Sequence, residues 1–384
     1  MDTIVRIGEK CTGCTACMNS CPVGAIHMTE DQAGFYYPTV DENSCIECGK
    51  CLTVCPVETT RKATDTRVRA YYGASDDPEL VKCSSSGGAF SLMAMYVLSQ
   101  QGLVCGAVMD YETREIVYAD TDQCELDALR RSKYVASFPK DIFCNIKREL
   151  ENGRTVLFCG LPCHVDGLRC FLKKDYEKLI LCDFICGGTA SPRFFREHLQ
   201  HLEKKYRSEV ADVNFRAKLN GWKEHSLKIS FRNGKEYRSV AFFDSFFKGY
   251  FEKPFQRNSC YACRYRLGHA SDIIVADYWG GLKKGRGNNQ GVSMVITNSK
   301  KGDTFFTDVL LKGNHTFTEM PLADSDYVFK TEEQRYTKAR VAKDNFMKLY
   351  GKKGFEKAAR ATYFRKITMQ KLKRNLVAVL KRNQ

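Results

Sequence analysis

The sequence predicts an α+β protein of several domains, and three observations lead to this prediction. A cysteine-rich stretch occupies residues 11–55, a body follows in which strand-like and helix-like segments alternate, and the C-terminal residues are strongly basic. With 384 residues, 43% of them hydrophobic, the chain is long enough for more than one buried core. We expect domains at 1–65, 66–155, 156–325 and 326–384, the last a basic helical tail.

The cysteine-rich stretch contains one spacing twice. Two runs of the form C-x2-C-x2-C-x3-C-P start 34 residues apart, at Cys11 and Cys45. This spacing is typical of bacterial ferredoxins with two 4Fe-4S clusters, in which the fourth cysteine of each run ligates the other cluster. The sequence therefore predicts a two-cluster ferredoxin domain with one ligand set of Cys11, Cys14, Cys17 and Cys55 and a second of Cys21, Cys45, Cys48 and Cys51.

Zinc and disulfides are the alternatives for these cysteines. Zinc would need two separated pairs and would leave the third and fourth cysteine of each run unused. Disulfides are disfavoured because the polar start, MDTIVRIGEK, does not resemble a secretory signal peptide. No apolar run approaches the length of a membrane span. Nineteen cysteines without an export signal indicate a reducing compartment, and we expect a cytoplasmic protein.

The body begins with a strand at 67–74, and a Ser/Gly-rich turn then opens a helix at 89–101 that stops at Gly102. A strand at 103–110 follows directly. Two further helix-to-strand units are expected, the first with a helix at 140–152 and a strand at 155–159, the second with a helix at 165–174 and a strand at 179–184. This order predicts an α/β core.

The second half of the body has a different pattern. Asn233-Gly234 lies between alternating segments and predicts a tight hairpin. Strands at 272–279 and 292–299 flank a glycine-rich loop, 280–291, for which no regular structure is expected.

The net charge of +15 is concentrated near the C-terminus. From Lys330 to Gln384 there are 17 Lys and Arg against four acids, a net +13, which leaves +2 for the rest. A basic amphipathic helix is expected from Phe355 to Leu380. It could be a solvated helix with a packed apolar stripe, or residues 330–384 could contact an anionic membrane or an acidic protein. Nucleic acid is disfavoured because no binding module accompanies the charge.

Ser84, Ser85, Ser86, Gly87 and Gly88 precede the helix at 89–101. Glycines allow a ligand to approach the backbone, and hydroxyls, free N–H groups and the helix dipole favour an anion such as a pyrophosphate. Serines before a helix are also ordinary N-caps. Both interpretations stay open at this point.

Four later cysteines form a second candidate site, and they come from three segments: Cys163, Cys186, Cys260 and Cys263. The first two follow predicted strands, at the edge where α/β sheets place their sites. Four thiolates could hold a third cluster or a zinc ion. Cys83 and Cys159 are reserve ligands, whereas Cys105, Cys124, Cys144, Cys170 and Cys182 fit ordinary buried positions.

A third candidate cluster combines Asn214, Arg216 and Lys218 with Trp222. Arg can bind a phosphate or carboxylate with two N–H groups and Trp can stack on a ring, so this group suits a planar anionic ligand. An exposed basic strand end explains it nearly as well.

In order and number, these motifs resemble the coenzyme F-420 hydrogenase/dehydrogenase beta-subunit family, in the form with a fused two-cluster ferredoxin domain. The resemblance spans about residues 1–325. It rests on the segments SSSGGAF (84–90), SKYV (132–135), GLPC (160–163), DFICG (183–187), NFR (214–216) with Gly221-Trp222, Cys260-x2-Cys263, ASDI (270–273) and DYWG (277–280).

The resemblance implies an α/β flavin-binding body with FAD, a third 4Fe-4S cluster, and hydride chemistry coupled to one-electron transfer. Ser84 to Gly88 and Lys133 would then contact the flavin, and the four later cysteines would ligate the third cluster. A flavin joins two-electron chemistry to one-electron clusters, so electrons would pass between a ferredoxin-type partner or redox complex and a small organic substrate. No catalytic residue is assigned.

Two alternatives accompany this hypothesis. The chain could be a deazaflavin-coenzyme dehydrogenase subunit of a larger complex, or an electron-transfer module without its own substrate, and relatives of the fused type occur among surface-polysaccharide functions. His164 and Gly187 depart from the residues that the family commonly has there, Gln and His, and this leaves the substrate open.

Overall fold

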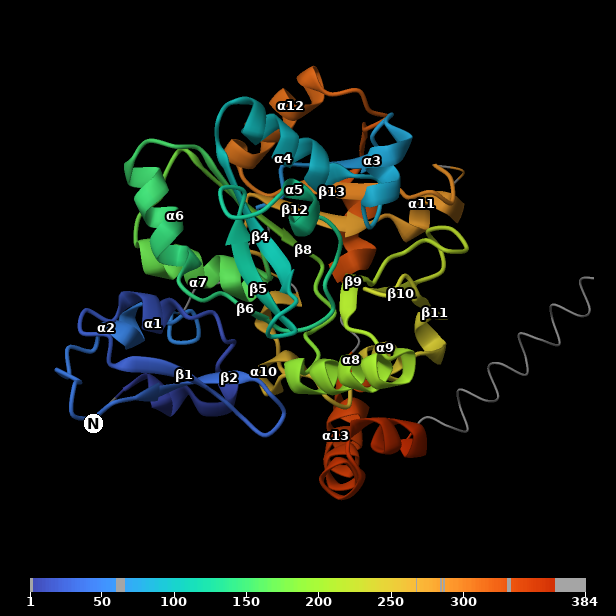
Figure 1. Ribbon diagram of the computed structural model, residues 1–384. Coiled ribbons are helices and arrows are strands. Elements are labelled where there is room, and N and C mark those ends of the chain that lie inside the picture. The colour runs from blue at the N-terminus through green and yellow to red at the C-terminus, as the bar shows by residue number, and fades with distance from the viewer. Residues whose placement is uncertain are drawn as a thin grey trace, which may run out of the picture.

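The computed structural model describes residues 3–59, 66–266, 268–283, 285, 287–329 and 333–362. Figure 1 shows a small N-terminal domain beside a central twisted sheet, and a second lobe below the sheet that includes the C-terminal helices. The predicted α+β architecture is confirmed at this level. Residues 60–65, within the predicted linker, lie outside the described part.

The N-terminal domain consists of two short helices and a hairpin. Each cysteine run leads into one of the helices, so the sequence repeat is also a structural repeat. The elements are the 3-10 helix η1 (Ile4–Lys10), α1 (Ala16–Ser20), β1 (Ile26–Glu30), β2 (Tyr36–Val40) and α2 (Lys50–Thr53). β1 and β2 pair in antiparallel register from Ile26 opposite Val40 to Glu30 opposite Tyr36.

The body is built on a mixed nine-stranded sheet. Its middle strands β12, β8, β7 and β4 are parallel, and antiparallel strands extend it on both sides. In sheet order the strands are β14 (Thr318–Met320), β3 (Arg69–Gly73), β13 (Ser293–Thr297), β12 (Ile273–Asp277), β8 (Leu179–Phe184), β7 (Val156–Cys159), β4 (Leu103–Asp110), β5 (Glu115–Asp120) and β6 (Ser137–Phe138).

Helices cover both faces of this sheet because alternate strand residues are apolar on both sides. Val104 and Ile180 pack toward α4 (Ala89–Ser99) and α12 (Lys300–Lys312), whereas Leu103 and Leu181 pack toward α6 (Ile142–Glu151) and α7 (Pro162–Leu172). Burial on both faces is typical of parallel strands. The carboxyl ends of β7 and β8 therefore stay free for a site.

The second lobe contains an antiparallel sheet, β11-β10-β9, and several helices around an aromatic core. Its elements are α8 (Pro192–Tyr206), β9 (Val210–Asn214), β10 (Ser226–Phe231), β11 (Glu236–Val240), the 3-10 helix η2 (Ala241–Phe243), α9 (Ser245–Glu252), α10 (Asn258–Tyr261) and α13 (Glu333–Lys353). The shorter elements elsewhere are α3 (Pro78–Cys83), α5 (Leu126–Leu129), η3 (Arg264–Arg266), α11 (Trp279–Lys283) and η4 (Leu322–Phe329).

The C-terminal segment is not a separate appendage over 333–362. Phe346, Phe355 and Ala359 are buried in the aromatic core, and Phe355 stacks on Phe194 of α8 with ring centroids 5.6 Å apart. A cut near Lys330 would therefore remove core side chains. Residues 363–384, most of the expected amphipathic helix, lie outside the described part.

Most predicted elements of the body are confirmed, and the differences have local causes. The helix expected at 165–174 starts earlier, at Pro162, because proline suits the first turn of a helix. The expected strand at 272–279 ends at Asp277, and α11 (Trp279–Lys283) begins at the last residue of that range and extends into the loop 280–291, for which no regular structure is expected. No helix in the described part of the chain is long and apolar enough to cross a membrane.

Candidate redox site

The structure brings the eight N-terminal cysteines together in two sets of four. Small cavities of about 20 and 30 Å³ lie inside the two sets. Cys55 lies with the first run and Cys21 with the second, which is the exchange expected from the sequence. The first cavity is lined by Cys11, Cys14, Cys17 and Cys55, and the second by Cys21, Cys45, Cys48 and Cys51.

The first set is buried and the second is more open. The pKa of the Cys14 thiol is raised to about 12, mainly by burial and in part by the neighbouring Cys11 and Cys55. Cys48 of the second set is exposed. The second set therefore offers the more accessible edge for an external redox partner.

The four later cysteines also meet, at a cavity of about 690 Å³. Cys163 lies in the first turn of α7, Cys186 follows β8, and Cys260 and Cys263 lie in and just after α10. Burial raises the pKa of Cys163 well above its usual value, and Cys263, Cys186 and Cys260 add to this. No three His, Cys, Asp or Glu side chains of the described residues converge closely enough for a single metal ion. A four-iron cube is larger and joins more widely spaced thiolates.

The cavity lies between the ferredoxin domain and the body. Thr12 and Gly13 line it from one side and the four cysteines line it from the other. Helix α7 packs against α1, and a Cβ at Gly167 would come 2.8 Å from the Cys14 sulfur, so glycine permits the close approach. Cys163 lies one helical turn before Gly167 on α7, so this helix brings the third cysteine set close to Cys14 of the first set.

A second cavity of about 430 Å³ lies at the start of α4. Ser84, Ser85, Ser86 and Gly88 line it, as do the first-turn residues of the helix. No side chain caps this helix, since its N-cap is Gly88 with φ +93°. An uncapped helix start that faces a cavity fits a phosphate group. Gly87 has no room for a Cβ, which would collide with the Gly73 carbonyl.

The serine hydroxyls form bonds that shape this loop. Ser86 Oγ donates to the Val292 carbonyl at 2.7 Å, and Ser85 Oγ accepts from the Ser132 amide at 2.8 Å. Gly87 N donates to Ser293 Oγ at 2.9 Å. The loop is therefore held in place before any ligand binds.

Lys133 lines the same cavity. Its ammonium donates to the carbonyl groups of Ala128 at 2.7 Å and Arg130 at 2.6 Å. The pKa of Lys133 is lowered to about 7, mainly by burial and in part by the nearby Arg131. An amine of this kind can hold or release a proton near neutral pH.

The two larger cavities adjoin each other at the carboxyl ends of β7 and β8. Leu161, Cys186, Gly188 and Thr189 line both. Cys186 therefore belongs to the third cysteine set and also to the wall of the second cavity. This places a possible cluster directly beside a possible ligand site.

Asn214, Arg216 and Lys218 are not among the residues that line the second cavity, and their direct contact with a cofactor stays a prediction. Arg216 is buried and donates to Asp277 Oδ2 at 2.8 Å and to the Ser85 carbonyl at 3.1 Å. Lys218 donates to the Ser86 carbonyl at 3.0 Å, and the Asn214 side chain accepts from the Arg216 amide. The guanidinium group of Arg216 is therefore paired with the Asp277 carboxylate. Arg216 and Lys218 hold the serine–glycine loop through its carbonyl groups, and Asn214 contacts Arg216.

Of the two tryptophans, Trp279 lines the second cavity, whereas sequence reasoning had selected Trp222. Trp222 is buried and stacks on Trp279, with ring centroids 4.2 Å apart and an interplanar angle of 11°. Trp222 Nε1 also donates to Asp277 Oδ1 at 3.0 Å. The DYWG segment (277–280) could have pointed to Trp279, because it contains this residue and begins with Asp277, which pairs with Arg216.

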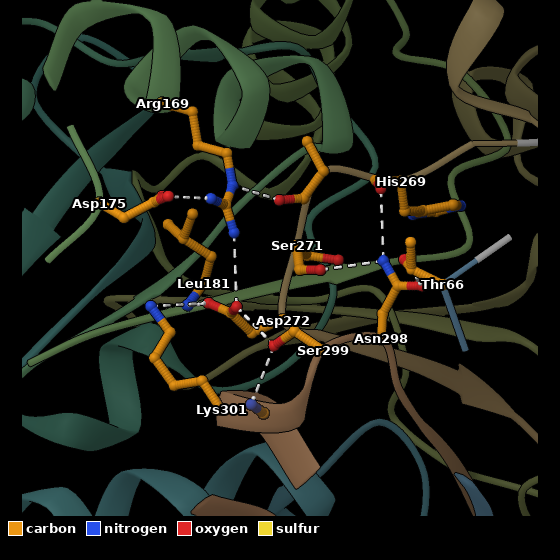
Figure 2. Close-up of polar contacts among 12 residues, drawn as sticks. Thr66, Arg169, Asp175, Leu181, His269, Ser271, Asp272, Asn298, Ser299 and Lys301 are labelled. Atoms are coloured by element: carbon orange, nitrogen blue, oxygen red, sulfur yellow. Dashed lines mark hydrogen bonds and ion pairs between the residues drawn. The ribbon is translucent and has the colours of Figure 1, made fainter. Parts of the chain in front are cut away.

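Sequence reasoning also missed a buried polar network around Asp272, which Figure 2 shows. Asp272 accepts from the Leu181 amide at 2.9 Å and from Ser299 Oγ at 2.7 Å, and Arg169 lies 3.4 Å from it. Asn298 Nδ2 donates to the Ser271 carbonyl at 3.0 Å. The network holds the chain at Ser271 and Asp272, just before β12.

The two departures from the family pattern have structural settings. His164 is buried and lies 3.3 Å from the Tyr118 hydroxyl; burial lowers its pKa to about 3, with Arg257 adding to the effect. Gly187 lines the second cavity, and a Cβ there would come 2.7 Å from the Tyr250 hydroxyl. Tyr250 thus occupies the space that a side chain at 187 would need.

Comparisons with known proteins match two separate parts of the chain. Residues 153–322 match the family described as the C terminus of the coenzyme F420 hydrogenase/dehydrogenase beta subunit, and residues 10–59 match the 4Fe-4S dicluster domain. Fold and site together define an iron–sulfur oxidoreductase. The chain therefore combines a C-terminal domain of the coenzyme F420 hydrogenase/dehydrogenase beta-subunit family with an N-terminal 4Fe-4S dicluster ferredoxin domain.

Three similar curated proteins match short stretches of this chain, 46 to 65 residues long. Ferredoxin-3 of Chlorobaculum tepidum is 40% identical over 65 residues, which cover 15% of this chain and 97% of that protein. Ferredoxin 7Fe of Hydrogenibacillus schlegelii is 47% identical over 53 residues, covering 13% and 62%. A component of the ion-translocating oxidoreductase complex of Methanosarcina acetivorans is 39% identical over 46 residues, covering 12% of this chain and only 16% of that protein.

Among solved structures, the F420-reducing [NiFe] hydrogenase complex from Methanosarcina barkeri contains a chain with 14% identity and a TM-score of 0.44. The match covers 76% of this chain and 95% of that chain. Similarity at this level is too low to support an argument about function.

Proposed function

We propose that the protein is an iron–sulfur flavoprotein oxidoreductase that passes electrons between three 4Fe-4S clusters and FAD, with hydride transfer to or from a small organic substrate. One observation carries the proposal: Cys186 lines both the cavity of the third cysteine set and the cavity at the start of α4. A cluster in the first cavity would adjoin a flavin in the second.

The proposed cluster ligands are the three cysteine sets described above. The path would run from the exposed set around Cys48 through the buried set around Cys14 to the set that contains Cys163. The packing of Gly167 against Cys14 supports the second step, because it brings helix α7 with Cys163 onto the buried set. The thiolates that hold these clusters would be stabilised by the iron.

The residues of the second cavity fit FAD in two respects. Its volume of about 430 Å³ is in the range of small-molecule sites, and the uncapped start of α4 suits a pyrophosphate. When bound, a flavin supplies two-electron chemistry that can be divided into single electrons. Ser84 to Gly88 would hold the phosphates, Lys133 would stabilise negative charge, and Arg216 would keep the loop in position through Ser85.

The direct experiment is anaerobic purification followed by iron analysis and flavin extraction. Three clusters require about twelve iron atoms per chain, and two require about eight. We expect about twelve, together with one extractable yellow chromophore. A protein with about eight iron atoms, or without a flavin, would contradict the corresponding part of the proposal.

The family description favours a second candidate, in which coenzyme F420 itself is the substrate and the chain is one part of a larger complex. Titration of the anaerobic protein with this deazaflavin decides between the two. Reduction or oxidation of the coenzyme would support the second candidate. A ferredoxin-type protein remains the proposed partner in both, and the exposed edge near Cys48 is the proposed contact.

A further inference from the structure

Two arginines flank the Cys260–Cys263 pair and reach from the body into the ferredoxin domain. Arg257 Nε donates to the Cys11 carbonyl at 2.7 Å, and its Nη2 donates to the Tyr36 carbonyl at 2.8 Å. Arg264 Nη1 donates to the Thr59 carbonyl at 3.2 Å, and its Nη2 donates to the carbonyl of Pro56. One side chain thus holds the main chain at the first cysteine of the buried set, and the other holds it next to the last, Cys55.

Arg257 fits a closely matched slot in the ferredoxin domain. Its side chain lies over the Tyr37 ring, 4.2 Å from the centroid, and the residue is only 4% exposed. A Cβ at Gly13 would lie 3.1 Å from its Nη1. The glycine therefore leaves the space that the guanidinium fills.

The charge of Arg257 has no carboxylate partner within the described residues. Its polar partners there are two carbonyl oxygens, and its other contacts are aromatic rings. A buried cation without a counter-ion is costly. Arg257 also lines the 690 Å³ cavity together with the four later cysteines. Thiolate-ligated 4Fe-4S clusters are anionic, so a cluster on either side would supply the missing negative charge.

Arg264 differs in this respect. Its Nη2 lies 3.1 Å from Asp166 Oδ2, and its side chain is 40% exposed. The charge of Arg264 is therefore compensated by Asp166 and partly screened by solvent. Arg264 contributes through its hydrogen bonds to the main chain of the ferredoxin domain.

We propose that Arg257 and Arg264 are positioning residues for electron transfer between the buried ferredoxin cluster and the third cluster. They fix the gap between the two, and the charge of Arg257 also raises the reduction potentials of both clusters, because a nearby cation favours the more negative reduced state. This inference rests on the proposed function, since it requires the third cluster.

The test uses the full chain purified without oxygen, with iron analysis, a potentiometric titration followed by EPR, and the magnetic interaction between the reduced clusters. The variants are Arg257→Lys, Arg257→Met and Arg264→Met. Arg6→Met is the matched control, because Arg6 lines the same cavity but pairs with Glu58 of its own domain at 2.5 Å.

We expect Arg257→Met to move the midpoint potentials of the two adjacent clusters to more negative values and to weaken their magnetic interaction. Arg257→Lys keeps the positive charge but loses the paired hydrogen bonds to the Cys11 and Tyr36 carbonyl groups. Its cluster potentials should therefore stay near those of the wild type, while the magnetic interaction between the clusters is weakened. Arg264→Met should weaken the interaction with little shift in potential. Arg6→Met should change neither quantity.

The outcomes separate this inference from the proposed function. A wild-type protein with about eight iron atoms lacks the third cluster and overturns both. About twelve iron atoms, with potentials and interaction unchanged in Arg257→Met, would overturn the inference and leave the function intact. If Arg257→Met loses iron from the ferredoxin domain, the Arg257→Lys protein decides: a magnetic interaction of wild-type strength would then contradict the positioning role.

Discussion

His198 and Glu356 form a buried ion pair, with His198 Nδ1 2.6 Å from Glu356 Oε1. The other ring nitrogen lies 2.9 Å from Asp244 Oδ2. Burial alone would lower the pKa of His198, but the charges and hydrogen bonds of Asp244 and Glu356 outweigh it and raise the pKa to about 10. One imidazolium therefore links α8, the N-cap of α9 and the helical residues 355–362 that follow α13.

This arrangement predicts a loss of stability in mild alkali. The folded pKa of His198 lies above its usual value of 6.5, so its contribution is fully present below about pH 6.5 and is lost as pH rises through about 10. Asp244 and Glu356 have lowered pKa values, and their contribution is lost only as acid protonates them. Chemical unfolding at several pH values between 6 and 10 should show a falling free energy of unfolding.

His198→Gln should lower the free energy of unfolding by about 3–5 kcal/mol near pH 6, because it leaves the buried Asp244 carboxylate and the partly buried Glu356 carboxylate without their cation. Its pH dependence between 6 and 10 should also become flatter. Glu79→Gln, which breaks the exposed pair with Lys82, is the control and should change stability by less than about 1 kcal/mol. An unchanged slope in His198→Gln would contradict the assignment.

Two truncations separate the structural part of the C-terminus from the rest. A chain that ends after Thr362 keeps Phe346, Phe355 and Glu356 and should keep its fold and iron. A chain that ends at Lys330 loses these groups and should be destabilised by several kcal/mol, since loss of a single buried Phe side chain costs about 3–5 kcal/mol. Thermal unfolding measures both.

The same truncation after Thr362 tests the proposed contact of the basic C-terminal residues with anionic membranes. Co-sedimentation with vesicles rich in anionic lipid at low salt should be weaker for the chain that ends after Thr362 than for the full chain. Equal sedimentation of the two would end that proposal.

The two cysteine sets of the N-terminal domain and the strands of the body could be predicted, because each depends on a local sequence pattern. The two C-x2-C-x2-C-x3-C-P runs predict even the exchange of Cys21 and Cys55, and β4 and β8 have the expected bounds. Helix α8 was not predicted, although Ser191-Pro192 and the spacing of Phe194, Phe195 and His198 are typical helix signals.

The side-chain contacts that support the candidate site could not be predicted, because they join residues far apart in the chain. Arg216 and Asp277 are 61 positions apart, and nothing local to NFR indicates a carboxylate partner. A guanidinium that binds a phosphate and one that binds an aspartate look the same in sequence. The hydrogen bond from Arg257 to the Cys11 carbonyl joins residues 246 positions apart, and it likewise depends on how the domains pack.

Gly87→Ala should impair flavin binding before it affects iron content. The new Cβ would collide with the Gly73 carbonyl, so the loop that faces the second cavity must move. We expect at least about tenfold weaker flavin retention, which corresponds to about 1.4 kcal/mol. The measurement is flavin per chain after gel filtration, with iron per chain as reference.

Gly153→Ala is the control for this change. Gly153 has φ +81°, but only Lys178 Nζ, at 3.9 Å, lies near its Cβ position, away from the cavity. It should cost stability through backbone strain without loss of flavin. Equal flavin loss in both variants would show that general destabilisation, not the loop, is responsible.

Cys163→Ser should remove about four iron atoms per chain and leave the two ferredoxin clusters in place, because a cube that loses a thiolate is held less tightly. Cys105→Ser is the control, since Cys105 is fully buried in the core beside α6 and α7. It should reduce stability without changing the iron count. Full iron content in Cys163→Ser would remove Cys163 from the ligand set.

Asp272→Asn should loosen the cysteine pair from a distance. In the network of Figure 2, Arg169 and Lys301 lie 3.4 and 3.6 Å from the Asp272 carboxylate, and the amide of an asparagine would leave both without their buried anion. Breaking such a network costs about 3–5 kcal/mol. The chain between Cys263 and β12 should then be less well held, and the third cluster should be lost faster to a chelator, while the ferredoxin clusters keep their rate.

Asp175→Asn is the matched control for the network, because Asp175 pairs with the same Arg169 at 2.8 Å but its side chain is 87% exposed. Solvent screens an exposed pair of this kind, so the change should alter neither stability nor the rate of iron loss by more than a small amount. If Asp272→Asn and Asp175→Asn both released iron at the wild-type rate, the network would stabilise the fold without positioning the cysteines.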